Sequence, residues 1–258
     1  MPAARDAAEQ GRWAPLRSWA VLLTTFAERP DLAERTSEIP SVWPEFMSHD
    51  ETVQAYWSRL RDELPQFQLV LYDEARDAVV GEGRTVPFRW DGLPGGLDDV
   101  LVRAFADEGA STALSACVAI VAPARRGEGL SGRLVEGMRE LAAAHGLRRL
   151  VALVRPMLKS RYPLTSMARY VQWCRADGLL FDPWIRVHAR LGAELLEVCD
   201  RSMVVGGGID EWESWTGMVF PDNGSYVVDG ALVPITIRRE ADRGEYIEPN
   251  VWMRHPVE

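Results

Sequence analysis

The chain has 258 residues, of which 47% are hydrophobic, and its formal net charge at pH 7 is −9. This apolar fraction is enough for a packed core, and the length suits one large domain or one domain with additions. The acidic balance argues against nucleic acid as the main partner, because phosphate backbones are bound by basic surfaces. It mildly favours a cationic small molecule such as an amine.

The three cysteines, Cys117, Cys174 and Cys199, are an odd number without C-x-x-C spacing. They indicate neither a disulfide framework nor a zinc site, so no metal is expected. The chain begins with polar sequence, and it lacks a run of about 18 apolar residues that would span a bilayer. We therefore expect a cytoplasmic protein with no membrane partner.

The first part of the chain alternates between apolar periodicity and polar breaks. It predicts, in order, a flexible N-terminus, a strand, a helix start, a second helix, a hairpin and a short helix, at residues 1–12, 19–26, 30–40, 51–64, 66–86 and 97–107. Between the two early helices, Trp43, Pro44, Phe46 and Met47 form an irregular apolar segment. This segment either packs under a loop or lines a pocket.

Residues 112–154 carry the strongest local signal. An apolar strand (112–121) runs into the turn Arg125-Arg126-Gly127-Glu128-Gly129, followed by a helix (130–145) and a second apolar strand (149–154). Glycines let the backbone bend inward, and the first N–H groups of a helix have no partner within the helix. The helix dipole adds favourable potential for negative charge there. The sequence therefore predicts a phosphate-binding turn.

The segment Arg126-x-x-Gly129-x-Ser131 resembles the Arg/Gln-x-x-Gly-x-Gly/Ala signature of the GNAT acyltransferase superfamily, which holds the pyrophosphate of acyl-coenzyme A. The predicted order of strands and helices over residues 66–199 is also similar to that family. The resemblance implies an α/β (α+β) fold with a mixed, mostly antiparallel central sheet flanked by helices. Two central strands, 112–121 and 149–154, would splay apart around the pantetheine arm.

The resemblance also implies the activity. The chain would be an N-acyltransferase, most simply an N-acetyltransferase, in which a small-molecule amine attacks acetyl-coenzyme A or another acyl-coenzyme A directly in a ternary complex. The co-substrate would be held by the strand end and the glycine-rich turn: Ala119, Ile120, Val121, Arg125, Arg126, Gly127, Glu128, Gly129, Leu130, Ser131 and Gly132. Arg125 and Arg126 would supply positive potential, with Glu128 pointing outward.

Two further residues are candidate catalytic groups by resemblance. Residues 187–193 resemble the family's Leu-Tyr-Glu-Lys-Leu-Gly-Phe, whose tyrosine often protonates the leaving thiolate, and His188 takes that place. A histidine acid would titrate near neutrality, although a helical histidine near a C-terminus also needs no catalytic reason. Glu82 lies on a predicted central strand where the family sometimes keeps a general base, and the alternatives for that role are Glu45, Asp91 and Glu211. Cys117 is interpreted as inert packing, with a nucleophile as the alternative.

Two rival functions use the same residues. Gly127-x-Gly129-x-x-Gly132 matches the dinucleotide fingerprint and would suit an NADP-dependent oxidoreductase. That function needs an acidic residue near the end of the next strand, where the chain has Arg155-Pro156. The other rival is a non-catalytic protein of this fold that binds coenzyme A or another ligand.

The remaining sequence departs from the family pattern. Residues 155–175 predict an inserted helix over the site. Lys159, Arg161 and Tyr162 would contact the 3′-phosphate of coenzyme A or the acceptor, or lie on a solvated loop. Asp182-Pro183 predicts a helix start. Residues 201–258 form an extension packed on the core at 13–200, whose hairpin (231–238 and 245–253) completes the sheet. Many relatives dimerise, so a homodimer is one option.

Overall fold

The computed structural model describes residues 21–106 and 109–257, so the predicted flexible segment 1–12 and the start of the first predicted strand lie outside it. The described strands form one sheet in the order β1-β2-β3-β4-β5-β9-β8-β7, with β6 also paired to β9. Every pairing is antiparallel except β4 with β5. The predicted mixed, mostly antiparallel sheet is confirmed. The strands are β1 (Val21–Thr25), β2 (Gln68–Asp73), β3 (Ala78–Phe88), β4 (Ala113–Val121), β5 (Leu150–Val154), β6 (Glu194–Gly207), β7 (Gly224–Tyr226), β8 (Ile235–Arg238) and β9 (Arg243–His255).

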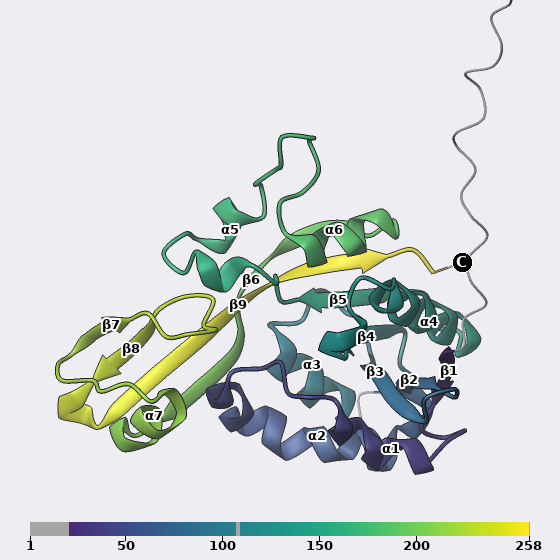
Figure 1. The fold of residues 1–258 in the computed structure, drawn as a ribbon, viewed down its shortest axis with the longest axis horizontal. Coiled ribbons are helices and arrows are strands. Elements are labelled where there is room, and N and C mark those ends of the chain that lie inside the picture. The colour runs from purple at the N-terminus through teal and green to yellow at the C-terminus, as the bar shows by residue number, and fades with distance from the viewer. Residues whose placement is uncertain (1–20, 107–108, 258) are drawn as a thin grey trace, which may run out of the picture.

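Helices cover both faces of this sheet (Figure 1). The first three lie on one face, here called the lower face, and α4, α5 and α6 lie on the other, the upper face. Short 3₁₀ turns connect several elements. The helices are α1 (Asp31–Arg35), α2 (Glu51–Glu63), α3 (Leu97–Ala104), α4 (Leu130–Ala144), α5 (Met167–Tyr170), α6 (Pro183–Arg190) and α7 (Ile209–Thr216), and the 3₁₀ turns are η1 (Thr36–Glu38), η2 (Glu45–His49), η3 (Pro65–Phe67), η4 (Pro123–Arg125), η5 (Lys159–Arg161) and η6 (Arg239–Ala241).

Two glycines allow α4 to pack closely on the sheet. A Cβ added at Gly83 of β3 would lie 2.6 Å from the Met138 Cε, and one at Gly137 of α4 would lie 2.4 Å from Leu23 Cδ2. Larger residues at either position would push the helix outward. Gly83 therefore has the close-approach role that glycine in a strand often indicates, and the position of α4 over the sheet is fixed.

The central parallel strands are paired over only part of their length. β4 and β5 share three pairs, from Leu114↔Leu150 to Ala116↔Ala152, although β4 continues to Val121. The pairing of β3 with β4 shifts where Arg84 is opposite Val118 and Thr85 is opposite Ala116, so Cys117 is an extra residue in β4. Such a bulge bends its strand. Residues 117–121 of β4 and 153–154 of β5 are not paired with each other, and this gap between the two strands, here called the wedge, confirms the predicted splay.

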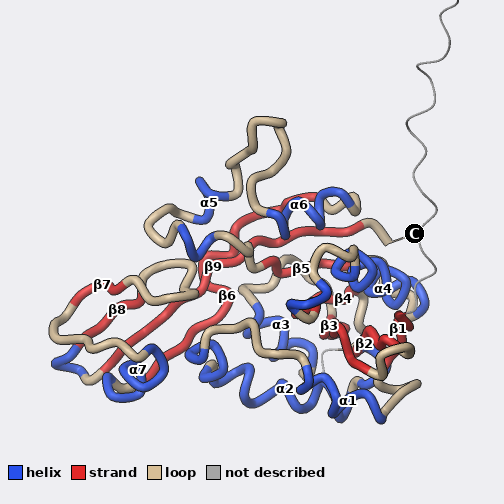
Figure 2. The backbone as a smooth tube through the Cα atoms, in the orientation of Figure 1, coloured by secondary structure: helices blue, strands red, loops and turns tan. Residues whose placement is uncertain are grey.

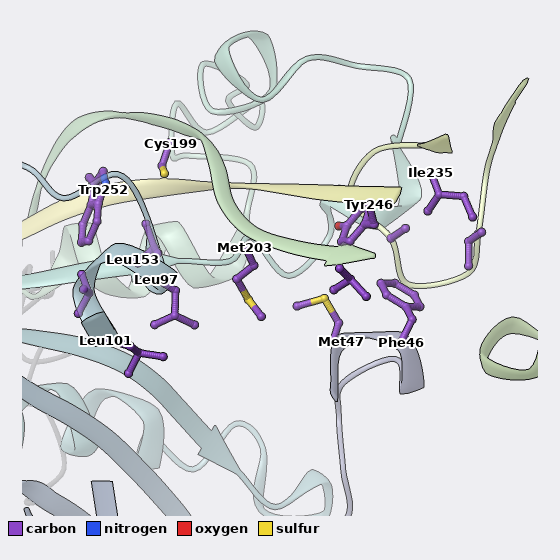
Figure 3. Close-up of a cluster of buried hydrophobic side chains, with 14 of the residues drawn as sticks. Phe46, Met47, Leu97, Leu101, Leu153, Cys199, Met203, Ile235, Tyr246 and Trp252 are labelled. Atoms are coloured by element: carbon purple, nitrogen blue, oxygen red, sulfur yellow. The ribbon is translucent and has the colours of Figure 1, made fainter. Parts of the chain in front are cut away.

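The C-terminal part of the chain builds the middle of the sheet. β9 pairs with β5 and β8 along one side and with β6 along the other, so the predicted hairpin is present and completes the sheet. β6 runs through residue 200, where the core was expected to end. Figure 3 shows Met203 of β6 between Leu153 and Trp252 on one side and Met47 and Tyr246 on the other. One core thus joins the C-terminal extension to the rest of the domain. The extension also contains α7 and β7, which the sequence analysis did not predict.

The inserted helix predicted over residues 155–175 is present only in part. The segment contains only the 3₁₀ turn η5 and the four-residue helix α5, and a loop projects between α5 and α6 (Figure 2). Pro156 and Pro163 interrupt it, because proline has no N–H to donate within a helix. Aromatic packing replaces helical hydrogen bonding: Tyr162 and Phe181 each meet Trp173 edge to face.

Candidate active site

The glycine-rich turn leaves the start of α4 open. Gly127 and Gly129 have φ of 84° and 81°, a region that favours glycine. Gly129 is the N-cap of α4 and no side chain caps this helix. A Cβ placed at Gly127 or Gly132 would meet nothing within 4 Å. The first amide N–H groups of α4 are therefore available to an anion, as the sequence predicts.

The two arginines of the turn differ in their partners. Arg125 binds Glu128 through Nε and Nη2 at 2.7 and 2.8 Å, and its Nη1 lies 2.7 Å from Asp73 Oδ2. These bonds raise the pKa of Arg125 and lower that of Glu128. Arg126 is exposed and has no ion pair within the described ranges. The expectation that both arginines supply uncompensated positive charge is therefore corrected: Arg125 shapes the turn, and Arg126 carries the unbalanced charge.

The strand before the turn presents backbone groups to the wedge. The Ala122 N–H donates to Val80 O of β3 at 2.9 Å. Because main-chain groups alternate along a strand, those of Val121 and Ala119 face the opposite way, toward β5. The main chain of Ile120 faces β3, where it pairs with Glu82. Two of the three predicted strand contacts, Ala119 and Val121, thus have groups directed at the wedge.

Glu82 lies on the lower face of the sheet. Its side chain is 13% exposed and forms an ion pair with Arg84 at 2.8 Å. Arg84 in turn packs over the ring of Phe26 at 4.5 Å and donates to Thr36 at 3.3 Å. The carboxylate is therefore near the wedge, across from Ile120, but it already has a cationic partner. Its role as a general base stays a prediction.

His188 is buried on the upper face. Asp182 caps α6 by accepting from Trp184 N and Ile185 N, as predicted, and this places His188 against β9. Its Nδ1 lies 2.8 Å from His255 Nε2, and Trp184 packs against the ring. Burial, followed by the charge of His255, lowers the pKa of His188 to about 3, so the expected titration near neutrality is wrong. Its Nε2 is buried and has no hydrogen-bond partner among the described residues. The acid role stays a prediction.

Two carboxylates that the sequence did not single out meet on the lower face. Asp50 caps α2 by accepting from Val53 N at 2.8 Å, and it also accepts from Val204 N of β6 at 3.1 Å. Asp98, in the first turn of α3, lies against Asp50, and its Oδ1 is buried without a partner in the described chain. Burial and then the Asp50 charge raise the pKa of Asp98 to about 7. This value suits proton transfer near neutral pH.

The tertiary contact behind this pair explains why the sequence missed it. Gly96, the N-cap of α3, has φ of 152°, and a Cβ there would lie 2.5 Å from Ser202 O of β6. This close approach of the α3 start to β6 brings Asp98 to Asp50. In the sequence, both residues read only as helix-start signals, which is their ordinary role.

The surroundings of two other candidate residues, Cys117 and Lys159, indicate structural roles. Burial raises the pKa of Cys117 to about 12, so its thiol stays protonated at neutral pH and is a poor nucleophile. Lys159 is fully buried, and its Nζ donates to Tyr162 O at 2.9 Å and Leu232 O at 2.5 Å. Both expectations for Lys159, a phosphate contact and a solvated loop, are therefore wrong. It joins the inserted segment to the C-terminal extension.

Within residues 21–106 and 109–257, no group of three His, Cys, Asp or Glu side chains is arranged to hold a metal ion. Across the same residues, every helix is too short or too polar to cross a bilayer.

Comparison with known proteins adds a clear relative. No protein-family model matches the chain. It is 30% identical over 272 residues to an arginine N-acetyltransferase from Aspergillus versicolor, covering 91% of this chain and 93% of the relative. Among solved structures, the loading GNATL domain of CurA from Lyngbya majuscula matches with a TM-score of 0.57 at 18% identity, over 92% of this chain and 98% of that one. The GphF GNAT-like decarboxylase in complex with isobutyryl-CoA matches with a TM-score of 0.54 at 17% identity, over 92% and 99%. None of these supports the oxidoreductase alternative.

Proposed function

This chain belongs to the GNAT superfamily and is an N-acyltransferase, and we propose that it transfers the acetyl group of acetyl-coenzyme A to the α-amine of arginine or a close relative of arginine. The donor is proposed from the family and from the phosphate-binding turn. The acceptor is proposed from the A. versicolor relative, whose identity of 30% extends over 91% of this chain. A small-molecule amine is the acceptor class that this relative supports.

The observation that carries the proposal is the wedge leading into the uncapped start of α4. β4 and β5 separate after Ala116↔Ala152, and β4 then runs directly to Gly127 and Gly129. An extended amide chain can pair with the free backbone of Ala119 and Val121 as an added strand would. A diphosphate at its end then meets the open amides of Leu130, Ser131 and Gly132. The amide-containing arm and the diphosphate of an acyl-coenzyme A can therefore each bind backbone groups of this chain.

The choice of the α-amine follows from acid–base chemistry. A guanidinium has a pKa above about 12 and keeps its proton at neutral pH, so it is not a nucleophile. An α-amine loses its proton far more easily and attacks the thioester carbon directly. The thioester is already activated, so no covalent enzyme intermediate is needed, which agrees with the protonated thiol of Cys117. The attack needs a group to accept the amine proton.

Two carboxylates on the lower face are candidates for that group. Glu82 is next to the wedge but is held by Arg84. Asp98 has a buried oxygen without a partner among the described residues, and its pKa of about 7 allows it to be deprotonated in part of the population at neutral pH. We favour Asp98 as proton acceptor on this ground and keep Glu82 as the alternative. On the upper face, we propose that His188 Nε2–H donates a hydrogen bond to the departing thiolate; with a pKa of about 3 the ring is neutral at pH 7 and does not itself transfer a proton.

The test is the release of free thiol from acetyl-coenzyme A, followed by mass spectrometry of the acceptor. Arginine is expected to gain one acetyl group at the α-nitrogen, faster than lysine or putrescine. Thermal protection by coenzyme A, without protection by NADPH, is the matching binding result. Thiol release that never exceeds hydrolysis for any amine would refute the proposal. A cytoplasmic location and a homodimeric state stay predictions.

A further inference from the structure

A buried ionic network lies at the open end of the wedge. Arg155 is the first residue after β5 and lies three residues beyond Ala152, the last residue of β5 that pairs with β4. Its partner Glu248 lies on β9 and is 1% exposed. Arg155 Nε lies 3.0 Å from both carboxylate oxygens of Glu248. Tyr246 Oη and Asn250 Nδ2 also donate to Glu248, at 2.9 and 3.0 Å.

The guanidinium of Arg155 has partners at Nε and Nη2 and an aromatic ring over it, while Nη1 is left without a partner in the described chain. Nε binds Glu248, Nη2 donates to Gly230 O at 2.7 Å, and the ring of Trp43 lies 5.3 Å from Cζ. Nη1 has no hydrogen-bond partner within residues 21–106 and 109–257, and the side chain remains 17% exposed. The fork is therefore fixed in orientation while one of its nitrogens is left for another anion.

The hydrogen bonds to Glu248 also fix the orientation of Arg155. A buried carboxylate is costly to desolvate, and an ion pair repays that cost only with several well-placed donors. Tyr246 and Asn250 donate hydrogen bonds to Glu248, and Glu248 in turn orients Arg155. The segment that places Trp43 over Arg155, residues 43–47, is the apolar segment before α2, and its Phe46 and Met47 belong to the lower-face core. Arg155 thus lies at the junction of the wedge and the lower face, where the acceptor amine must arrive.

We propose that Arg155, oriented by Glu248, binds the carboxylate of an amino-acid acceptor. This inference rests on the proposed acyl transfer to arginine and adds what the enzyme recognises in it. Glu248 already balances the charge of Arg155, but its fixed guanidinium can still donate one charge-assisted hydrogen bond from Nη1 to a carboxylate oxygen. The α-amine is attached to the carbon that carries this carboxylate, so fixing one group fixes the other. Arg155 is accordingly a specificity residue, and Glu248 is a positioning residue.

Agmatine, which is arginine without its carboxylate, provides the test. The wild-type enzyme is expected to acetylate arginine with a kcat/KM about 10- to 100-fold above that for agmatine, the range for losing one charged hydrogen bond. Arg155→Met is expected to lose this preference by lowering kcat/KM for arginine while leaving that for agmatine within about threefold. Glu248→Gln is expected to lower the preference partly. Arg169→Met, at an exposed arginine in the same inserted segment, is the matched control and should change the kcat/KM of neither substrate.

The outcomes separate the two ideas. Equal use of arginine and agmatine by the wild type overturns the carboxylate site while leaving acyl transfer intact. An equal loss for both substrates in Arg155→Met, with a lowered melting temperature, also overturns it, because the residue is then only structural. If that variant does not fold, Arg155→Lys keeps the charge without the fork, and an unchanged arginine-to-agmatine ratio in it counts against the proposal. Wild-type enzyme that acetylates neither substrate overturns the proposed function together with this inference.

Discussion

Asp73 and Arg125, which are 52 residues apart in the sequence, meet across the sheet edge with Oδ2 and Nη1 2.7 Å apart. Asp73 ends β2 and is fully buried, while Arg125 belongs to the phosphate-binding turn. Arg125 binds Glu128 with its other nitrogens. The turn is therefore braced from the second strand, so that its shape does not depend on glycine alone.

Replacing Asp73 with Asn should weaken this brace. The hydrogen bonds from Arg76 and then Arg125 hold the pKa of Asp73 below its ordinary value, so the carboxylate is charged at neutral pH. Losing its charge should raise KM for acetyl-coenzyme A about fivefold, equivalent to about 1 kcal/mol, with kcat within twofold. Steady-state kinetics measure this. Glu140→Gln, which breaks an exposed ion pair with Arg133, is the control, and equal KM values in the two variants would show that Arg125 needs no brace.

Gly127→Ala separates backbone strain from ligand contact. Its φ of 84° should make alanine cost about 1 kcal/mol of stability, although a Cβ meets no atom within 4 Å. Gly146, beyond the other end of α4, has φ of 68° and the same open surroundings. Both alanine variants should lose similar melting temperature, but only Gly127→Ala should raise KM for acetyl-coenzyme A, by about tenfold or more. A similar rise in Gly146→Ala would remove the assignment of the turn to the co-substrate.

Asp98→Asn should change the pH dependence of stability. The pKa of Asp98 is raised from its model-compound value of 3.8 to about 7. Its protonated form is favoured by folding, so this contribution is complete below pH 3.8 and is lost as the pH rises through 7. The melting temperature of Asp98→Asn relative to wild type should therefore rise between pH 4 and 7 and level off above that range.

The same variant tests proton transfer. If Asp98 accepts the amine proton, kcat/KM of the wild type should decrease as the pH is lowered below 7. Asp98→Asn should have a lower kcat/KM that no longer depends on pH in this range. Asp99→Asn is the neighbouring control, because Asp99 pairs with Arg103 and has a lowered pKa. A melting-temperature difference that is the same at pH 5 and pH 8 would contradict the raised pKa.

His188→Ala tests the proposed donor to the thiolate. Its partner His255 supplies the control, since both variants break the same buried pair and cost similar packing. We expect kcat to fall about 10- to 100-fold in His188→Ala but only a few-fold in His255→Ala. Because burial lowers the pKa of His188 to about 3, the wild-type kcat should show no histidine titration between pH 6 and 8. Equal kcat values in the two variants would leave His188 a packing role.

Local signals in the sequence predicted most of the elements and the turn. The hydrophobic periods of β2, β3, α2, α4 and β9, and the Asp182-Pro183 start of α6, depend on neighbouring residues and were confirmed within a few positions. The open helix start at Gly129 follows from local glycine chemistry in the same way. The helix predicted in the inserted segment is present only in part because aromatic packing and two prolines outweighed its helical spacing.

Contacts between distant residues could not be predicted from one sequence. Asp50 and Asp98 meet only because Gly96 lets α3 approach β6, and Arg155 meets Glu248 only because β9 enters the sheet next to β5. From the sequence, Arg125 is expected to bind phosphate, but in the structure its guanidinium pairs with Asp73. Charge patterns along the chain give the sign of a surface, but pairing in space decides which charges remain available.

The position of β9 has a consequence for how the protein folds. The strand that occupies the middle of the sheet is Arg243–His255, far along the chain from the strands before β5. A chain cut before Arg243 exposes one edge of β5 and one edge of β6, which are sites for pairing with other chains. Such a truncation should therefore yield an aggregating product instead of a shortened enzyme.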